Sequence, residues 1–307
     1  MLYLIASIVL SVALLLNFRL FPRYGVNTFQ AIVFNYPVCF LTGYALLPAG
    51  QSFRVNFGQT WMWLALGLGV GFIVTFLLSG ASTQRSGITA TSLANNLSLV
   101  IPVSFSLFVF GSSKAFDWLN YVGLVLALVA VGLSTYQKPA PAEPASDVKT
   151  GARTGRSALL PIAVFLMYGA TNTMINYMNL RYIPSADKTV AVTLTMVLGA
   201  IVTGLLLLGV RVVQGKERLE ARNLVAAVTL GVPNFLSFYT LLLALSAFGG
   251  NGAFVYPIYN IGVILLAAGS AALFFREQLL PINRLGLVLA IVAIGLISWQ
   301  ELRALFA

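Results

Sequence analysis

The chain has no histidine, a single cysteine and few charged residues. Its 307 residues include one Cys (Cys39) and eight Asp or Glu. Histidine is the commonest general base and metal ligand in proteins, so its absence argues against a metal site and against acid–base catalysis. One cysteine cannot form an intrachain disulfide. No apolar run carries a carboxylate pair or an activated nucleophile, and we therefore expect neither an enzyme nor a bound cofactor.

The small number of charged residues also indicates that lipid, rather than water, surrounds most of the chain. Charged residues make up 8% of the sequence, against about 25% in a typical soluble domain. Hydrophobic residues make up 59%, and the mean hydropathy is +0.92. This composition predicts an integral, multi-pass protein of the cell membrane, with the lipid bilayer as its main partner. The net charge of +10 resides in loops beside apolar runs, which favours contact with anionic lipid head groups over nucleic acid.

The apolar runs are long enough to be transmembrane helices, which need about 20 apolar residues. Because hydrophobic and polar residues do not alternate, helices fit better than barrel strands. Ten spans are expected, at Leu2–Leu16, Phe29–Leu47, Trp61–Thr83, Ile88–Phe110, Trp118–Tyr136, Ser157–Leu180, Thr189–Val213, Leu224–Leu245, Ala253–Phe275 and Ile282–Trp299.

One stretch of the sequence occurs twice. Residues 123–133 read GLVLALVAVGL and residues 286–296 read GLVLAIVAIGL. The match extends outward at the same offset, since Asn120 aligns with Asn283 and Gly87 with Gly250. Chance similarity between apolar helices is the alternative, but the glycine spacing and the flanking asparagines also agree. The sequence therefore predicts an internal duplication.

A polar stretch rich in Pro, Ala and Gly divides the chain into two parts. It covers residues 138–156 and predicts an extended linker rather than a helix. Residues 1–137 and 157–307 then hold five spans each. Because five is an odd number, two homologous halves must enter the membrane in opposite senses. The predicted fold is an all-α membrane protein of ten transmembrane helices, built as two inverted five-helix repeats.

Two segments carry a resemblance to a known family. Residues 91–134 and 254–298 each contain a helix with small residues and a proline, a short turn, and a final helix with the pattern G-x-x-L-x-x-x-G. The chain resembles the EamA-type members of the drug/metabolite transporter superfamily, which carry an acidic residue in this turn. Glu277 fits that feature, whereas Lys114 stands at the equivalent position of the first half. The resemblance implies a transporter for amino acids, sugars, nucleotide derivatives or drugs.

Polar residues within the spans are candidates for a substrate site. Tyr168, Asn172, Asn176 and Asn179 are spaced four, four and three residues apart, so they share one helical face. Amides facing lipid are costly, and this face should turn inward. The alternative is that these amides only join helices by hydrogen bonds.

The fourth and ninth spans are partners in the duplication. The fourth carries Asn95 and Asn96 before Pro102, and the ninth carries Tyr256, Tyr259 and Asn260 around Pro257. Proline kinks a helix and frees backbone carbonyls, and aromatic rings beside amides suit a small organic ligand. A kinked packing helix is the alternative, and Tyr256 also suits a membrane-interface position.

Several hydroxyls and amides in other spans are secondary candidates. A single hydroxyl usually bonds the carbonyl four residues before it, and such a bond within its own helix is the alternative for each hydroxyl. These secondary candidates are Ser7, Ser11, Asn35, Tyr36, Thr75, Ser79, Asn234 and Ser237.

No acidic residue lies near the centre of a predicted span, so the pathway should be nearly uncharged. We expect a secondary transporter that moves a small neutral or zwitterionic organic metabolite by alternating access. A flippase for a lipid-linked or amphiphilic substrate is the alternative on the same fold. A non-transporting scaffold is a further alternative, and the sequence leaves open whether the chain forms a homodimer. The distribution of Lys and Arg puts the termini outside the cytoplasm, whereas the family resemblance implies cytoplasmic termini, and orientation therefore also stays open.

Overall fold

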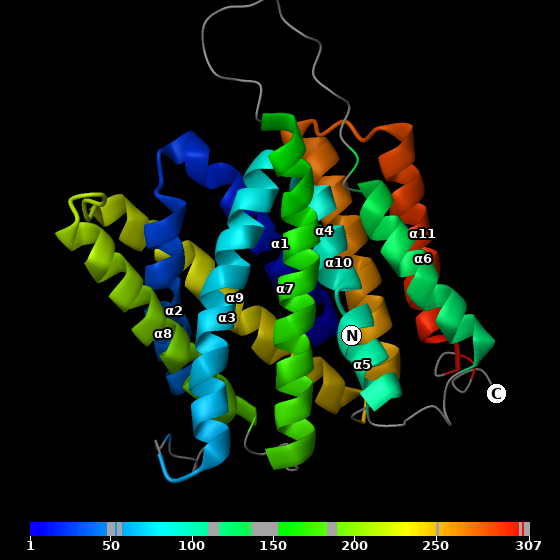
Figure 1. Cartoon of the computed structure of the whole chain (residues 1–307), viewed down its shortest axis with the longest axis horizontal. Helices are drawn as coiled ribbons and strands as arrows, with labels where there is room; N and C mark the ends of the chain where they lie inside the picture. The colour runs from blue at the N-terminus through cyan, green and yellow to red at the C-terminus, as the bar shows by residue number, and fades with distance from the viewer. Residues whose placement is uncertain are drawn as a thin grey trace, which may run out of the picture.

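The described part of the chain is helical throughout. The computed structural model describes residues 1–47, 53, 57–109, 117–134, 136, 153–182, 189–249, 252–300 and 303. The helices are α1 (Leu2–Leu20), a 3-10 turn η1 (Phe21–Tyr24), α2 (Thr28–Ala45), α3 (Thr60–Arg85), α4 (Ile88–Leu97), α5 (Val100–Val109), α6 (Trp118–Ser134), α7 (Arg153–Tyr182), α8 (Thr189–Val213), α9 (Ala221–Ala247), α10 (Gly252–Phe275) and α11 (Pro281–Ile297), arranged as one bundle (Figure 1).

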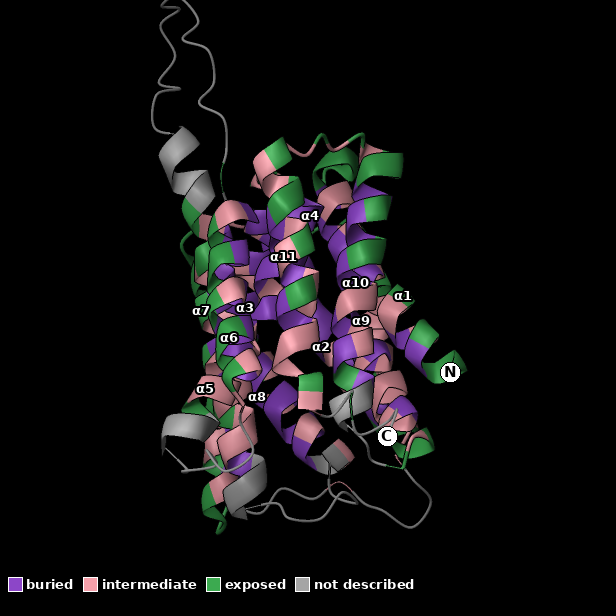
Figure 2. Ribbon diagram, turned by 90° about the vertical axis from the view of Figure 1, so that its right-hand side faces the viewer, coloured by how far each residue is buried: buried purple, intermediate pink, exposed green. Residues whose placement is uncertain are grey.

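The bundle has the surface of a membrane protein. Seven candidate spans in the described residues are long and apolar enough to cross a bilayer, and α6 and α11 are shorter apolar helices of 17 residues each. Large apolar side chains such as Leu206 on α8 and Val125 on α6 are more than 60% exposed on the outside. Figure 2 shows the buried residues gathered on the inward faces of the helices. This distribution of apolar surface is consistent with a multi-pass helical membrane protein.

Two of the sequence predictions differ from the structure. The span expected at 88–110 is two helices, because Pro102 has no N–H for the carbonyl of Ser98. That carbonyl instead accepts a bond from the N–H of Ile101 at 3.0 Å, and the chain turns between α4 and α5. The linker expected at 138–156 was predicted to be non-helical, but α7 already begins at Arg153. Residues 138–152 lie outside the described part.

Helix packing follows the offset that aligns Asn120 with Asn283. Under this offset α1, α2, α3 and α6 correspond to α7, α8, α9 and α11, and the span formed by α4 and α5 corresponds to α10. In the bundle α2 packs on α9 and α3 packs on α8, so each contact has its counterpart in the other half. The contact of α1 with α9 is matched in the same way by that of α7 with α3. Corresponding elements also meet each other, as α2 meets α8, α4 meets α10 and α6 meets α11.

The α6–α11 pair shows this correspondence at the level of single atoms. The Asn120 amide donates to the carbonyls of Leu296 (3.2 Å) and Ile297 (2.7 Å) at the end of α11. The Asn283 amide donates to the carbonyls of Leu133 (2.9 Å) and Ser134 (3.3 Å) at the end of α6. Each asparagine lies in the first turn of its own helix and binds carbonyls at the end of the other, which fixes the two helices side by side and antiparallel (Figure 1).

Two glycines allow the same pair of helices to approach closely. A Cβ atom on Gly123 would lie 2.8 Å from the backbone nitrogen of Ile297, and one on Gly286 would lie 3.1 Å from the carbonyl oxygen of Ala130. Small residues permit such backbone contact between helices in lipid. The duplicated pattern thus specifies a close helix crossing.

Candidate functional site

Hydroxyl groups from both halves of the chain meet inside the bundle. The Ser11 hydroxyl of α1 and the Tyr259 hydroxyl of α10 are 2.8 Å apart and share a hydrogen bond. The Ser79 hydroxyl of α3 donates to the Tyr168 hydroxyl of α7 at 3.4 Å. Each bond joins a helix from the first half to one from the second, so the interface between the halves is polar and uncharged at these points.

Two further hydroxyls lie beside these pairs without a partner. Tyr36 of α2 is 2% exposed and Thr75 of α3 is 3% exposed, and neither hydroxyl has a hydrogen-bond partner among the described residues. The Tyr36 ring lies 5.8 Å from that of Phe76 on α3, one turn from Ser79, and Thr75 also lies one helical turn from Ser79. An unpaired buried hydroxyl costs about 1–3 kcal/mol, which is a cost that binding of a polar solute or water would remove.

We call these six residues the central hydroxyl cluster. Its members are Ser11, Tyr36, Thr75, Ser79, Tyr168 and Tyr259. Four of its members form the two hydrogen-bonded pairs, Ser11 with Tyr259 and Ser79 with Tyr168. The cluster combines aromatic area with groups that both donate and accept hydrogen bonds, and these are the features of a site for a small organic molecule.

Amide and thiol groups beside the cluster mainly join helices. The Asn234 amide of α9 donates to the side-chain oxygen of Asn35 on α2 at 3.1 Å, and the Cys39 thiol donates to the Gly231 carbonyl at 3.3 Å. The Ser7 hydroxyl donates to the Ser237 carbonyl at 2.7 Å. These bonds satisfy the groups concerned, so they fix α1 and α2 against α9.

The structure brings some of the predicted site residues together. Tyr168 and Tyr259 belong to the central hydroxyl cluster, and Asn260 is buried beside Tyr259 with 6% of its surface exposed. Asn172 and Asn176 are half-buried on α7, one and two turns beyond Tyr168. Their amides make no hydrogen bond within the described part of the chain.

The remaining predicted residues lie elsewhere. Asn96 is buried and donates to the Ser92 carbonyl of its own helix at 2.8 Å, as a packing residue would. Asn95 is half-buried near the end of α4. Tyr256 is 42% exposed on the outer surface, one turn from Tyr259. The side chain of Asn179 lies outside the described residues.

Two carboxylates at one end of the bundle had no predicted role. We call this end, where α6 ends and α4, α9 and α11 begin, the linker end; it is the upper end in Figure 1. Glu277 follows α10, and its carboxylate accepts bonds from the N–H groups of Ile88 (3.0 Å) and Thr89 (3.3 Å) in the first turn of α4. A negative charge at this position also compensates the positive end of the α4 dipole. A cavity of about 270 Å³ beside it is lined by residues including Glu277, Thr89, Ser134 and Asn283.

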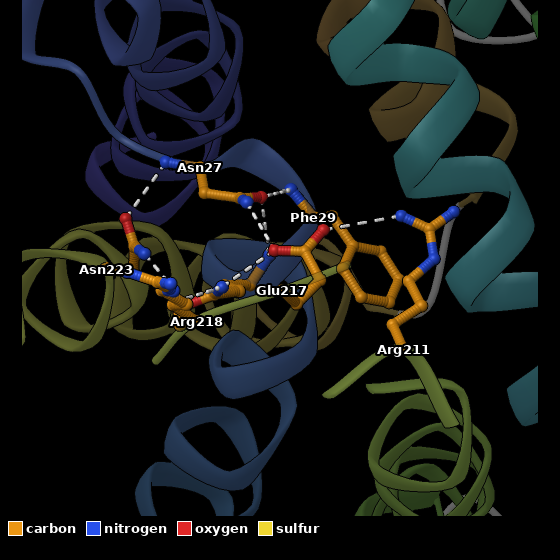
Figure 3. Close-up of polar contacts among 7 residues, drawn as sticks. Asn27, Phe29, Arg211, Glu217, Arg218 and Asn223 are labelled. Carbon is orange, nitrogen blue, oxygen red and sulfur yellow. Dashed lines mark hydrogen bonds and ion pairs between the residues drawn. The ribbon is translucent and has the colours of Figure 1, made fainter. Parts of the chain in front are cut away.

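Glu217, in the loop between α8 and α9, is the second carboxylate at the linker end. Its carboxylate accepts bonds from the amides of Asn27 (2.6 Å) and Gln30 (2.8 Å) at the start of α2 (Figure 3). Arg211 pairs with it at 3.5 Å, and Asn223 donates to the Gln30 side-chain oxygen at 2.8 Å. Gln30 and Asn223 are almost fully buried, so this network ties the loop to α2.

Comparison with known proteins shows the fold but no activity. No family model matches the chain. An uncharacterized protein of Haemophilus influenzae is 26% identical over 299 residues, which cover 95% of both chains. A protein of known crystal structure aligns with a TM-score of 0.54 at 12% identity, covering 96% of this chain and 98% of that one. At this identity the second comparison shows a shared fold alone.

Proposed function

We propose that this protein is a secondary transporter of the EamA type, which moves a small neutral or zwitterionic organic solute across the cell membrane. Its ten spans would form two inverted five-helix repeats, with α4 and α5 together making one span. The solute would bind between the halves, and the bundle would open to one side of the membrane at a time.

The packing of the helices supports the repeat. The contacts of α2 with α9 and of α3 with α8 are equivalent under the sequence offset, and so are the Asn120 and Asn283 clamps. Halves related by a two-fold axis would give this exchange of partners. The antiparallel α6–α11 pair fits an axis that lies in the plane of the membrane.

The central hydroxyl cluster is the observation that carries the proposal. It draws on α1, α2, α3, α7 and α10, and its hydrogen bonds Ser11–Tyr259 and Ser79–Tyr168 both join one half to the other. A solute placed there would bond to hydroxyls from both halves. Movement of one half against the other would then close the site to one side of the membrane and open it to the other.

The chemistry of the cluster indicates the class of solute. Tyrosine rings provide apolar area, while hydroxyls and the amides of Asn172, Asn176 and Asn260 provide orientation. The described side chains of the cluster carry no formal charge. A strongly charged solute would lose its hydration there without a counter-charge, so a neutral or zwitterionic one is favoured.

The proposal can be tested with purified protein. A thermal-shift screen against amino acids, sugars, nucleosides and amphiphilic drugs should find a solute that raises the melting temperature, because binding to the native state alone stabilises it. That solute should then be taken up by proteoliposomes in counterflow. The double variant Asn172→Leu, Asn260→Leu should fold normally and lower the counterflow rate at least tenfold.

Tyr44→Phe is a matched control for cluster variants such as Tyr168→Phe. Tyr44 is 57% exposed on α2 and stacks on Phe40, a contact that phenylalanine preserves. Tyr44→Phe should transport like the parent protein, and Tyr168→Phe should not. Equal transport by parent, double variant and Tyr168→Phe would refute the site, and flipping of a fluorescent lipid without solute counterflow would refute the substrate class.

A further inference from the structure

We propose that Glu217 and Glu277 are two latches which hold the linker end of the bundle closed. This inference rests on the proposed alternating-access function. It assigns to two loop carboxylates the task of setting the balance between the inward- and outward-facing conformations.

Glu277 connects the two halves at the start of α4. It belongs to the second half, whereas Ile88 and Thr89, whose N–H groups it binds, belong to the first. The turn that carries it is specific: Arg276 has a φ of 51°, and the N–H of Glu277 bonds back to the Ala271 carbonyl at 3.0 Å. A left-handed backbone is unfavourable for a residue other than glycine, so the surrounding structure must hold this turn in place.

Gly87 is required on the other side of the same contact. Its φ is +103°, and a Cβ atom there would lie 2.8 Å from the Glu277 carboxylate. The carboxylate therefore lies directly against the backbone that precedes α4. Any opening between α4 and the end of α10 must break both charge-assisted hydrogen bonds.

Glu217 connects the halves in the same way at the start of α2. It lies in the second half and binds the amides of Asn27 and Gln30 in the first, with 11% of its side chain exposed (Figure 3). Asn27 also begins α2, because its side-chain oxygen accepts the N–H groups of Phe29 and Gln30. Separation of α2 from the α8–α9 loop would leave a carboxylate and two amides without partners.

The sequence duplication identifies the residues of the first half that correspond to Glu217 and Glu277. The offset that aligns Asn120 with Asn283 aligns Glu217 with Arg54 and Glu277 with Lys114. Both latch carboxylates of the second half therefore correspond to basic residues of the first. Arg54 and Lys114 lie outside the described residues, but a basic side chain accepts no hydrogen bond, so neither can supply the acceptor that a carboxylate supplies in each latch. The two latches stabilise the closed linker end, which we therefore expect to be the resting state.

Thiol labelling tests this asymmetry without knowledge of the solute. The only native cysteine is removed by Cys39→Ala, and one reporter is added for each end of the bundle. Leu93→Cys reports on the linker end, because Leu93 lines the cavity beside Glu277 and is 1% exposed. Ala65→Cys reports on the opposite end, because Ala65 lies near the start of α3 and is fully buried. Ala90→Cys is a second linker-end reporter in case Leu93→Cys does not fold.

In nanodiscs, Glu277→Gln should raise the maleimide labelling rate of Leu93→Cys about tenfold, and Glu217→Gln should act in the same direction. Gly87→Ala should have the same effect without altering a charge. Labelling of Ala65→Cys should fall or stay unchanged, because the opposite end closes as the linker end opens. The control is Glu220→Gln, since Glu220 is an exposed carboxylate in the same loop as Glu217 and pairs with exposed Arg222. This control should leave both rates unchanged.

Two results would overturn the latch proposal. Unchanged labelling of the linker-end reporters in Glu277→Gln would show that this end is not held by the carboxylate. Faster labelling of both ends would show general loosening. Counterflow of the same variants separates the two proposals, because transport with unchanged labelling refutes the latches alone, and changed labelling without transport of any solute refutes the transporter alone.

Discussion

The α6–α11 pair and the two loop carboxylates differ in whether equivalent positions of the two halves carry equivalent residues. In the pair, Asn120 and Asn283 make the same bonds in both directions, and Gly123 and Gly286 allow the same close contact. At the carboxylates the duplication is broken, since Glu277 corresponds to Lys114. Equivalent residues are kept where the two halves must be held together. They diverge at the loop carboxylates, which in the proposed transporter would distinguish one side of the membrane from the other.

Crowding of the α6–α11 crossing should have the largest effect. Gly123→Leu and Gly286→Leu place atoms where backbone already lies, and each should destabilise the protein by about 3 kcal/mol. The matched controls are Gly132→Leu and Gly295→Leu, which occupy equivalent positions on the same helices with open space around the Cβ atom. Thermal unfolding in detergent measures the difference. Unequal effects at Gly123 and Gly286 would contradict the equivalence of the two helices.

Removal of either asparagine clamp should have the next largest effect. Asn120→Leu and Asn283→Leu each leave helix-end carbonyls without a donor, which should cost about 1–2 kcal/mol. The two variants should lower the apparent melting temperature by similar amounts. A large loss for one and none for the other would show that only one clamp contributes.

Restoration of the symmetry at the carboxylates should have a smaller effect. Lys114→Glu gives the first half the residue of the second, and should allow a carboxylate contact at the opposite end. The closed form of that end would be stabilised, so labelling of Leu93→Cys at the linker end should rise several-fold. No change in labelling would refute the equivalence of Lys114 and Glu277.

Repair of the α4–α5 break should have the smallest effect. Pro102→Ala restores an N–H for the Ser98 carbonyl and should raise stability by about 1 kcal/mol or less. It should also make the fourth span more like α10, which stays continuous through Pro257. Circular dichroism and the melting temperature measure the gain. A lower melting temperature would show that the break is needed for packing.

Local patterns made parts of this structure predictable. Long apolar runs predicted the helices, because helix formation depends on residues close in sequence. The repeated Gly and Asn positions predicted that the helices now seen as α6 and α11 are equivalent, but not that they pack on each other. The shared face of Tyr168, Asn172 and Asn176 followed from helical spacing. Pro102 was identified as a kink, but a separate α5 was not expected.

Long-range partners could not be predicted in the same way. Helical spacing predicts the face of the helix on which Ser11 or Ser79 lies, but it does not predict which tyrosine lies opposite. Asn96 and Asn260 are both amides in an apolar span that contains a proline, so the sequence did not distinguish them. The structure shows that Asn96 bonds within its own helix. Glu277 was expected in a turn, whereas its contact with α4 needs the fold. In the sequence, the alignment of Glu277 with Lys114 indicated that the two turns differ, but not what Glu277 contacts.

Labelling of Ser79→Cys from each side of the membrane tests the central claim most directly. Ser79 is 2% exposed and bonds Tyr168 between the halves. With Cys39→Ala in sealed vesicles of defined orientation, an impermeant thiol reagent should label Ser79→Cys from either side, and a bound solute should slow both reactions. Labelling from neither side, or from one side only, would contradict alternating access at the central hydroxyl cluster.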